Sequence, residues 1–82
     1  MTDYEQKALI YAEKIGIIEY SVNGNVMEYL TFYGQSEGWY YIVVDLESMT
    51  EIYRGQAFPW MGFIPCWLKA ENGGLKYNYM EG

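Results

Sequence analysis

The run Trp39-Tyr40-Tyr41-Ile42-Val43-Val44-Asp45-Leu46 is the feature that most constrains the fold of this chain. β-Branched and aromatic residues fill it, and neither glycine nor proline interrupts it. Such residues suit the pleated, half-buried surface of a sheet. The run therefore predicts a central β-strand, around which the other segments form hairpins and one helix.

Residues 2–16 have the pattern of an amphipathic helix. Thr2-Asp3-Tyr4-Glu5 matches a capping box, in which the threonine hydroxyl accepts a hydrogen bond from the glutamate amide. Gly16 can take the left-handed conformation that ends a helix. One stripe at helical spacing is apolar and consists of Tyr4, Ala8, Tyr11, Ala12 and Ile15. This stripe predicts a helix that packs on the sheet.

A hairpin is predicted around Asn23-Gly24-Asn25, because Asn-Gly between alternating segments is a strong turn signal. The flanking segments are residues 17–22 and 26–33. A two-residue loop at Asn23-Gly24 would place two like charges, Glu19 and Glu28, opposite each other. A loop that also includes Asn25 places Tyr20 opposite Glu28, so we favour the longer loop.

This register also predicts which side chains face the helix. They share one face of the hairpin and are Ile18, Tyr20, Val22, Val26, Leu30 and Phe32. The opposite face is unusually aromatic for a solvated surface and carries Ile17, Glu19, Met27, Tyr29, Thr31 and Tyr33.

The remaining segments complete an antiparallel meander. Residues 34–38 form a glycine-bounded loop before the central strand, and a second hairpin turns at residues 47–50. Residues 55–68 contain two prolines and many large apolar side chains, which predicts an aromatic loop. A turn at residues 71–74 precedes a last strand over 75–80. The fold class is therefore α+β: an N-terminal helix on a small antiparallel meander sheet of four to five strands, in one domain over residues 1–82.

The sequence lacks the groups that most enzymes use. It contains no histidine, which removes the commonest general base and the commonest metal ligand. Its one cysteine, Cys66, lies between Pro65 and Trp67, and a free cysteine without a neighbouring base behaves as a small hydrophobe. The glycine-rich segments lack the pattern of phosphate-binding loops. We therefore expect no catalytic residue, no metal and no cofactor.

Three carboxylates, Asp45, Glu47 and Glu51, cluster around the second predicted turn. Paired carboxylates can act as acid and base, but a solvated hairpin end explains this cluster without catalysis. The central glycine of a calcium-binding loop is also absent. We interpret these residues as part of an acidic surface.

The formal net charge is −6, from eleven acidic and five basic residues. This charge repels phosphate backbones and anionic lipids, so we expect no direct contact with nucleic acid or membrane. A protein partner with a basic surface is expected instead. With one cysteine and no signal-peptide pattern near Met1, the cytoplasm is the expected location.

Aromatic residues supply the remaining functional signal. The chain has ten tyrosines and three tryptophans, which bury a large area at interfaces with few torsions to order. Trp60, which follows Pro59, is expected to be exposed, whereas Phe58, Phe63 and Trp67 are expected to complete the core. The candidate interaction surface combines aromatic and acidic side chains: Tyr29, Tyr33, Asp45, Glu47, Glu51 and Trp60.

These features favour a non-enzymatic protein that binds another protein. In size and composition the chain resembles the small anti-defence and anti-restriction proteins of phages and mobile elements. That resemblance implies an inhibitor whose carboxylates imitate phosphates in a basic nucleic-acid-binding site. Two alternatives stay open. One is a homo-oligomeric structural or regulatory module, for example a homodimer formed through the aromatic sheet face, and the other is a small-molecule binding domain.

Overall fold

The computed structural model describes residues 2–61, 63–69 and 75–81, with side chains described up to Met61 and at Pro65. One helix precedes six strands, and a short 3-10 helix separates the fourth strand from the fifth in this part of the chain. The elements are α1 (Asp3–Ile15), β1 (Ser21–Asn23), β2 (Val26–Phe32), β3 (Trp39–Asp45), β4 (Thr50–Ala57), η1 (Pro59–Met61), β5 (Phe63–Lys69) and β6 (Leu75–Glu81).

The ends of α1 follow from its capping residues. The Glu5 amide donates to the Thr2 hydroxyl over 3.1 Å, which satisfies one of the free amides of the first turn. Gly16 has a φ of 81°, and its amide donates to the carbonyl of Ala12. Ala8 and Ala12 are buried, and their small side chains bring the helix close to the sheet. The predicted helix and its packing are confirmed.

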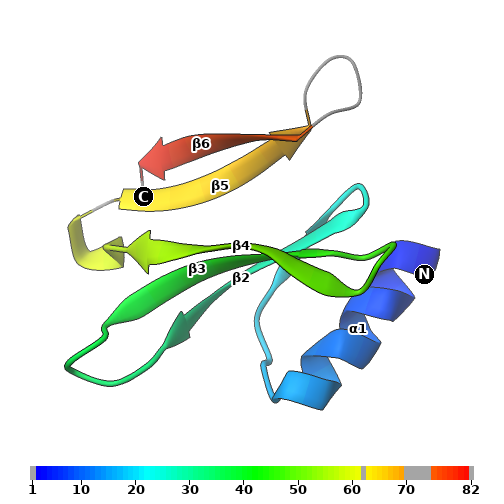
Figure 1. Cartoon of the computed structure of the whole chain (residues 1–82), viewed down its shortest axis with the longest axis horizontal. Helices are drawn as coiled ribbons and strands as arrows, with labels where there is room; N and C mark the ends of the chain where they lie inside the picture. The colour runs from blue at the N-terminus through cyan, green and yellow to red at the C-terminus, as the bar shows by residue number, and fades with distance from the viewer. Residues whose placement is uncertain (1, 62, 70–74, 82) are drawn as a thin grey trace.

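Strands β1 to β4 form one antiparallel sheet in sequential order, and β5 and β6 form a separate two-stranded sheet. The β5–β6 hairpin lies on one side of the larger sheet and α1 on the other (Figure 1). The α+β fold with a helix on an antiparallel meander is therefore confirmed. The central strand is buried on both faces, because Tyr41 to Val44 are almost inaccessible.

Two core clusters divide the sheet into two faces. The helix face contacts α1 and contains Met27, Tyr29, Ile42, Val44 and Leu46. The opposite face, called the hairpin face, contains Val26, Tyr41, Val43 and Ala57. Strand β5 lies against β3 and β4, and its Pro65 is buried. The sheet is thus the middle of three layers.

The predicted register of the first hairpin is wrong. Asn23 pairs with Val26 around the two-residue loop Gly24-Asn25, and Ser21 lies opposite Glu28. Gly24 has a φ of 62°, as the first central residue of a type II′ turn requires. In this register Ser21, and not Glu19, lies opposite Glu28, so the like charges are separated although the loop has only two residues.

A change of one residue in register turns side chains to the other face. Met27 and Tyr29 therefore pack toward α1, together with Tyr20 and Val22 from the preceding segment. The prediction that Val26, Leu30 and Phe32 face the helix is wrong, because Val26 and Leu30 pack in the cluster of the hairpin face. Ile18, also predicted to face the helix, is 91% exposed.

The β3–β4 turn uses an aspartate where the sequence lacks glycine, asparagine and proline. Asp45 accepts hydrogen bonds from the Glu47 amide and the Ser48 hydroxyl, at 3.0 and 3.1 Å. Met49 takes a positive φ of 59°, which is rare for a side chain of this kind. A β-bulge follows, since Val43 pairs with Tyr53 whereas Val44 pairs with Glu51.

Residues 55–68, predicted as one aromatic loop, are divided among the end of β4, η1 and β5. Pro65 lies within β5, opposite Tyr79. Strand β5 pairs on one side only, and proline is tolerated in such an edge strand. The predicted last strand is confirmed as β6. The predicted turn at 71–74 lies outside the described residues, as do the side chains of Phe63, Cys66 and Trp67.

Candidate functional site

The bulge in β4 places Glu51 and Arg54 on the same face of the sheet. In a regular strand, residues three apart point to opposite faces. Here Arg54 pairs with Ile42 and Glu51 pairs with Val44, and both partners belong to the helix face. The two charged side chains therefore lie side by side on the helix face and remain exposed to solvent.

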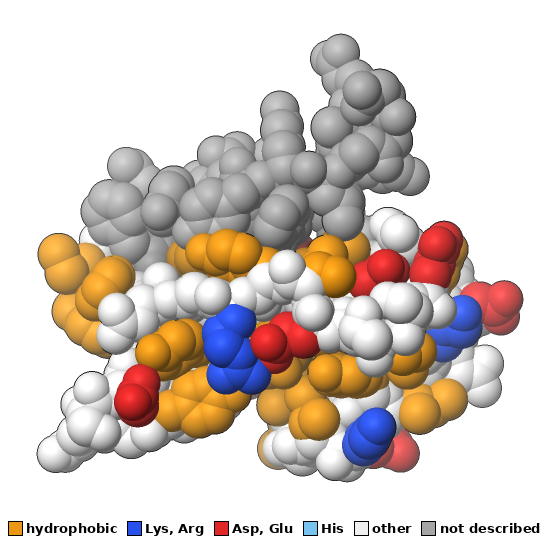
Figure 2. All heavy atoms as spheres, viewed as in Figure 1, with side chains coloured by type: hydrophobic (Ala, Val, Ile, Leu, Met, Phe, Trp, Pro, Cys, Tyr) orange, Lys and Arg blue, Asp and Glu red, His pale blue; other side chains and the backbone are white. Residues whose placement is uncertain are grey.

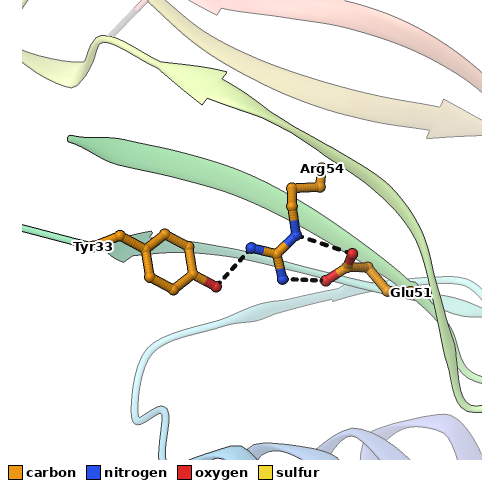
Figure 3. A network of polar contacts seen from close by, with 3 residues as sticks. All are labelled: Tyr33, Glu51 and Arg54. Atoms are coloured by element: carbon orange, nitrogen blue, oxygen red, sulfur yellow. Dashed lines mark hydrogen bonds and ion pairs between the residues drawn. The ribbon is translucent and has the colours of Figure 1, made fainter. Parts of the chain in front are cut away.

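Tyr33, Arg54 and Glu51 form a polar network on this face (Figure 3). The Arg54 guanidinium donates to both Glu51 carboxylate oxygens, through Nε at 3.0 Å and Nη2 at 2.7 Å. Its Nη1 donates to the Tyr33 hydroxyl at 2.8 Å. The hydrogen bonds that Arg54 donates to Glu51 and Tyr33 raise the pKa of Arg54 above its usual value. The network fixes one cation against one anion, so it presents little net charge.

A second tyrosine extends this network toward the 34–38 loop. The Tyr40 ring contacts the Tyr33 ring edge-on, with centroids 5.4 Å apart. The Tyr40 hydroxyl donates to Glu37 at 2.9 Å, and this hydrogen bond raises the pKa of Tyr40. The Gln56 side-chain amide donates to the Glu37 carbonyl. The loop is therefore held to β3 and β4 by side chains.

An acidic corner forms where the start of α1 meets the β3–β4 turn. The Tyr4 hydroxyl donates to the Glu47 carboxylate at 2.8 Å. That hydrogen bond raises the pKa of Tyr4, and the negative charges of Glu47, Asp45 and Asp3 act in the same direction. These carboxylates thus all lie near the Tyr4 side chain, although they come from distant parts of the sequence.

Aromatic side chains gather at the end of the sheet where β2 and β4 end and β3 begins, next to η1. Phe32 and Trp39 contact each other across β2 and β3, with ring centroids 5.3 Å apart. Phe58 and Trp60 meet edge-on at 5.6 Å. Trp60 is 66% exposed and Met61 is 64% exposed, both on η1. This end of the sheet presents large apolar surface to solvent.

A hollow opens beside the edge strand β1. It is lined by side chains from the first turn of α1 and from the segment that leads into β1: Glu5, Ile18, Glu19, Tyr20 and Val22. This hollow was not predicted, because residues 17–20 have the sequence pattern of a paired strand. Within the described part of the chain, they pair with no strand.

The six predicted interaction residues lie in four places. Glu51 and Tyr33 are joined through Arg54, and Asp45 and Glu47 belong to the acidic corner. Trp60 is exposed at the aromatic end, as expected. Tyr29 is 8% exposed and belongs to the core beneath α1, so it offers almost no surface to a partner. Phe58, expected in the core, is exposed.

Arg54 was absent from the predicted surface, although it links two of the predicted residues. Its role could have been predicted only from the β-bulge, because a regular β4 would place Arg54 and Glu51 on opposite faces of the sheet. Among the described residues, no group of three or more acidic or cysteine side chains is placed to hold a metal ion. The described helices include none long and apolar enough to cross a membrane.

The described surface is mixed in character. Acidic and hydrophobic side chains lie beside each other over the part of the face that Figure 2 describes. Such a surface can exclude water with its rings and attract cations with its carboxylates. The chain matches no protein-family model, and no curated protein or solved structure is significantly similar to it.

Proposed function

We propose that this chain is a non-enzymatic protein that binds a basic site on another protein. The observation that carries the proposal is the exposure of its carboxylates. Seven acidic residues are exposed in the described part of the chain: Asp3, Glu5, Glu13, Glu19, Glu37, Glu47 and Glu51. Within the described side chains, the one ion pair joins Glu51 to Arg54. The other charges are available to a partner.

Exposed aromatic and sulfur-containing side chains support the same function. Trp60, Met61 and Phe58 are all exposed on or beside η1. Side chains of these types are enriched at interfaces, where a few of them contribute most of the binding energy. Carboxylates would attract the partner and fix its orientation, and the apolar side chains would stabilise the complex.

The finer proposal is that the partner's basic site is one that binds nucleic acid. Some of the exposed carboxylates would then take the places of phosphates, and binding would inhibit the partner. A net charge of −6 on 82 residues fits this role. The single cysteine suits a reducing compartment, so we place this function in the cytoplasm.

The test is capture of partners on the immobilised chain at low and high salt. A basic partner should be recovered at low salt, lost at high salt and displaced by DNA. Trp60→Ala should weaken capture, whereas Ile10→Ala, which removes exposed apolar surface on the outer side of α1, should not. A partner held equally at both salt concentrations through an acidic or neutral site would refute the proposal.

A further inference from the structure

We propose that the hollow beside β1 receives an extended, basic segment of a protein partner, which adds a strand to the edge of the sheet. This inference rests on the proposed function and names the contact through which it acts. It is carried by three features of the described residues: an open strand edge, exposed apolar side chains beside it and two carboxylates.

The open edge follows from the directions of the backbone groups. The Leu46 amide donates to the Asn25 carbonyl at 2.8 Å, so the odd-numbered residues of β2 direct their backbone groups toward β3. The even-numbered residues, including Glu28, then pair with β1. Because Glu28 lies opposite Ser21 and Val26 opposite Asn23, Val22 between them directs its amide and carbonyl away from the sheet.

Strand β1 is the edge of the sheet, so no described strand takes up these groups. An added strand could form hydrogen bonds with Val22 without displacing any pair of the existing sheet. It could continue along residues 17–20, which pair with no described strand. This is the geometry of β-strand addition to an exposed edge.

The lining of the hollow combines apolar side chains with two carboxylates. Ile18, at 91%, has the most exposed large apolar side chain among the described residues, and it lies beside Tyr20 and Val22 in the lining. Glu5 closes the hollow from α1, and Leu9, four residues later, lies on the same side of the helix and is partly exposed. Alternate apolar side chains of a partner strand would pack here.

The charge of the lining indicates which class of partner segment would bind. The lining contains two carboxylates, Glu5 and Glu19, and no cation. Lys7 lies over the Tyr4 ring, on the side of α1 that meets the acidic corner. A lysine or arginine in the added strand would therefore lie beside two carboxylates. A second copy of this chain would bring like charges together, which favours a basic partner over a homodimer.

The probe is a short synthetic peptide that alternates valine and lysine. It is added to the folded 82-residue chain, and binding is observed by NMR of the chain. Binding should shift the resonances of residues 18–22 and slow hydrogen exchange of the Val22 amide. A peptide of the same sequence with methylated backbone nitrogens keeps the charge but cannot pair with the edge, so it should not protect Val22. A valine–glutamate peptide should not bind.

Matched variants separate the hollow from the general acidity of the chain. Glu19→Lys should weaken binding of the valine–lysine peptide by about tenfold, as expected for a close charge pair at an interface. Glu13→Lys makes the same charge change at an exposed residue outside the lining and should have little effect. Ile18→Ser should weaken binding, whereas Ile10→Ser should not.

Equal effects of Glu19→Lys and Glu13→Lys, equal binding of the methylated peptide, or shifts confined to other residues would overturn the inference. Failure of the proposed function has a different signature. If a basic partner is captured normally by Glu19→Lys and Ile18→Ser, the partner-binding function stands and this site does not. If the peptide protects Val22 but every captured partner is acidic or neutral, the site stands and the basic-partner function does not.

Discussion

Gly55 shows how one residue without a side chain allows an aromatic contact. On the hairpin face, the Tyr53 side chain extends over Gly55, and the Tyr53 and Tyr41 rings contact each other with centroids 5.9 Å apart. A Cβ at position 55 would lie 2.8 Å from Cζ of Tyr53, closer than atoms in contact can approach. The glycine therefore serves packing and not backbone conformation.

Gly55→Ala should destabilise the fold by roughly 1 kcal/mol or more, the usual cost of overpacking, because the Tyr53 ring must move from its place on the sheet. Denaturant unfolding measures the change. The same substitution in a Tyr53→Leu background should cost much less, since the clashing ring atoms are gone. Equal costs in the two backgrounds would show that Tyr53 is not the cause.

Tyr29 links the core to the behaviour of the chain at high pH. Burial raises the pKa of Tyr29 to about 12, whereas an unfolded tyrosine titrates near pH 10. Between these values the unfolded state loses a proton that the folded state keeps. The stabilising contribution is complete below about pH 10 and is lost as pH rises through about 12.

The free energy of unfolding should therefore fall as pH increases above about 10. Hydrogen bonds to carboxylates raise the pKa of Tyr4 and Tyr40, which adds to the fall. Urea unfolding at a series of alkaline pH values measures the slope, and the slope should be shallower for Tyr29→Phe. An unchanged slope in this variant would contradict the assignment to Tyr29.

At the scale of elements, the bulge in β4 decides which side chains act together. It brings Glu51 and Arg54 to one face, where the ion pair is reinforced by Tyr33. Both charged side chains are partly exposed, so solvent screens their attraction.

A double-mutant cycle with Glu51→Gln and Arg54→Gln should give a coupling energy below about 1 kcal/mol that decreases as salt is added. Thermal or denaturant unfolding of the four proteins supplies the cycle. A coupling that is large or insensitive to salt would show that the pair is shielded from water.

The elements differ in how far their sequences specify them. Capping residues marked both ends of α1, and the uninterrupted run of β-branched and aromatic residues identified the central strand β3. The register of β1 and β2 was missed because like-charge avoidance was weighed above turn chemistry. A glycine as the first central residue of a type II′ turn would have indicated the loop Gly24-Asn25.

Strand β5 was missed for a different reason. Its proline argues against a strand that has partners on both sides, but β5 has a partner on one side only. The candidate site was predicted only in part, because exposure depends on packing. Trp60 could be placed from its position after Pro59, whereas the burial of Tyr29 followed from a register that the sequence pattern did not settle.

At the scale of the whole molecule, two covers protect one sheet. Helix α1 covers one face and the β5–β6 hairpin lies on the other (Figure 1). Val26, Tyr41 and Val43 of the hairpin face are almost inaccessible. A domain of this size has little stability to spare, so both covers should be required.

A chain that ends at residue 61 should bind hydrophobic dyes and self-associate, because the apolar side chains of the hairpin face lose their cover. Dye fluorescence and light scattering check this outcome. The full-length chain carrying an exposed substitution such as Glu13→Gln serves as the control. A truncated chain that stays monomeric and unfolds at the same denaturant concentration would show that the hairpin contributes little.

The order of the layers also bears on synthesis. The helix is made first, the sheet next and the second cover last, so a nascent chain emerging from the ribosome can assemble its meander while one side is still bare. Chaperones that recognise apolar strands would meet that side during elongation, until β5 and β6 have been made and cover it.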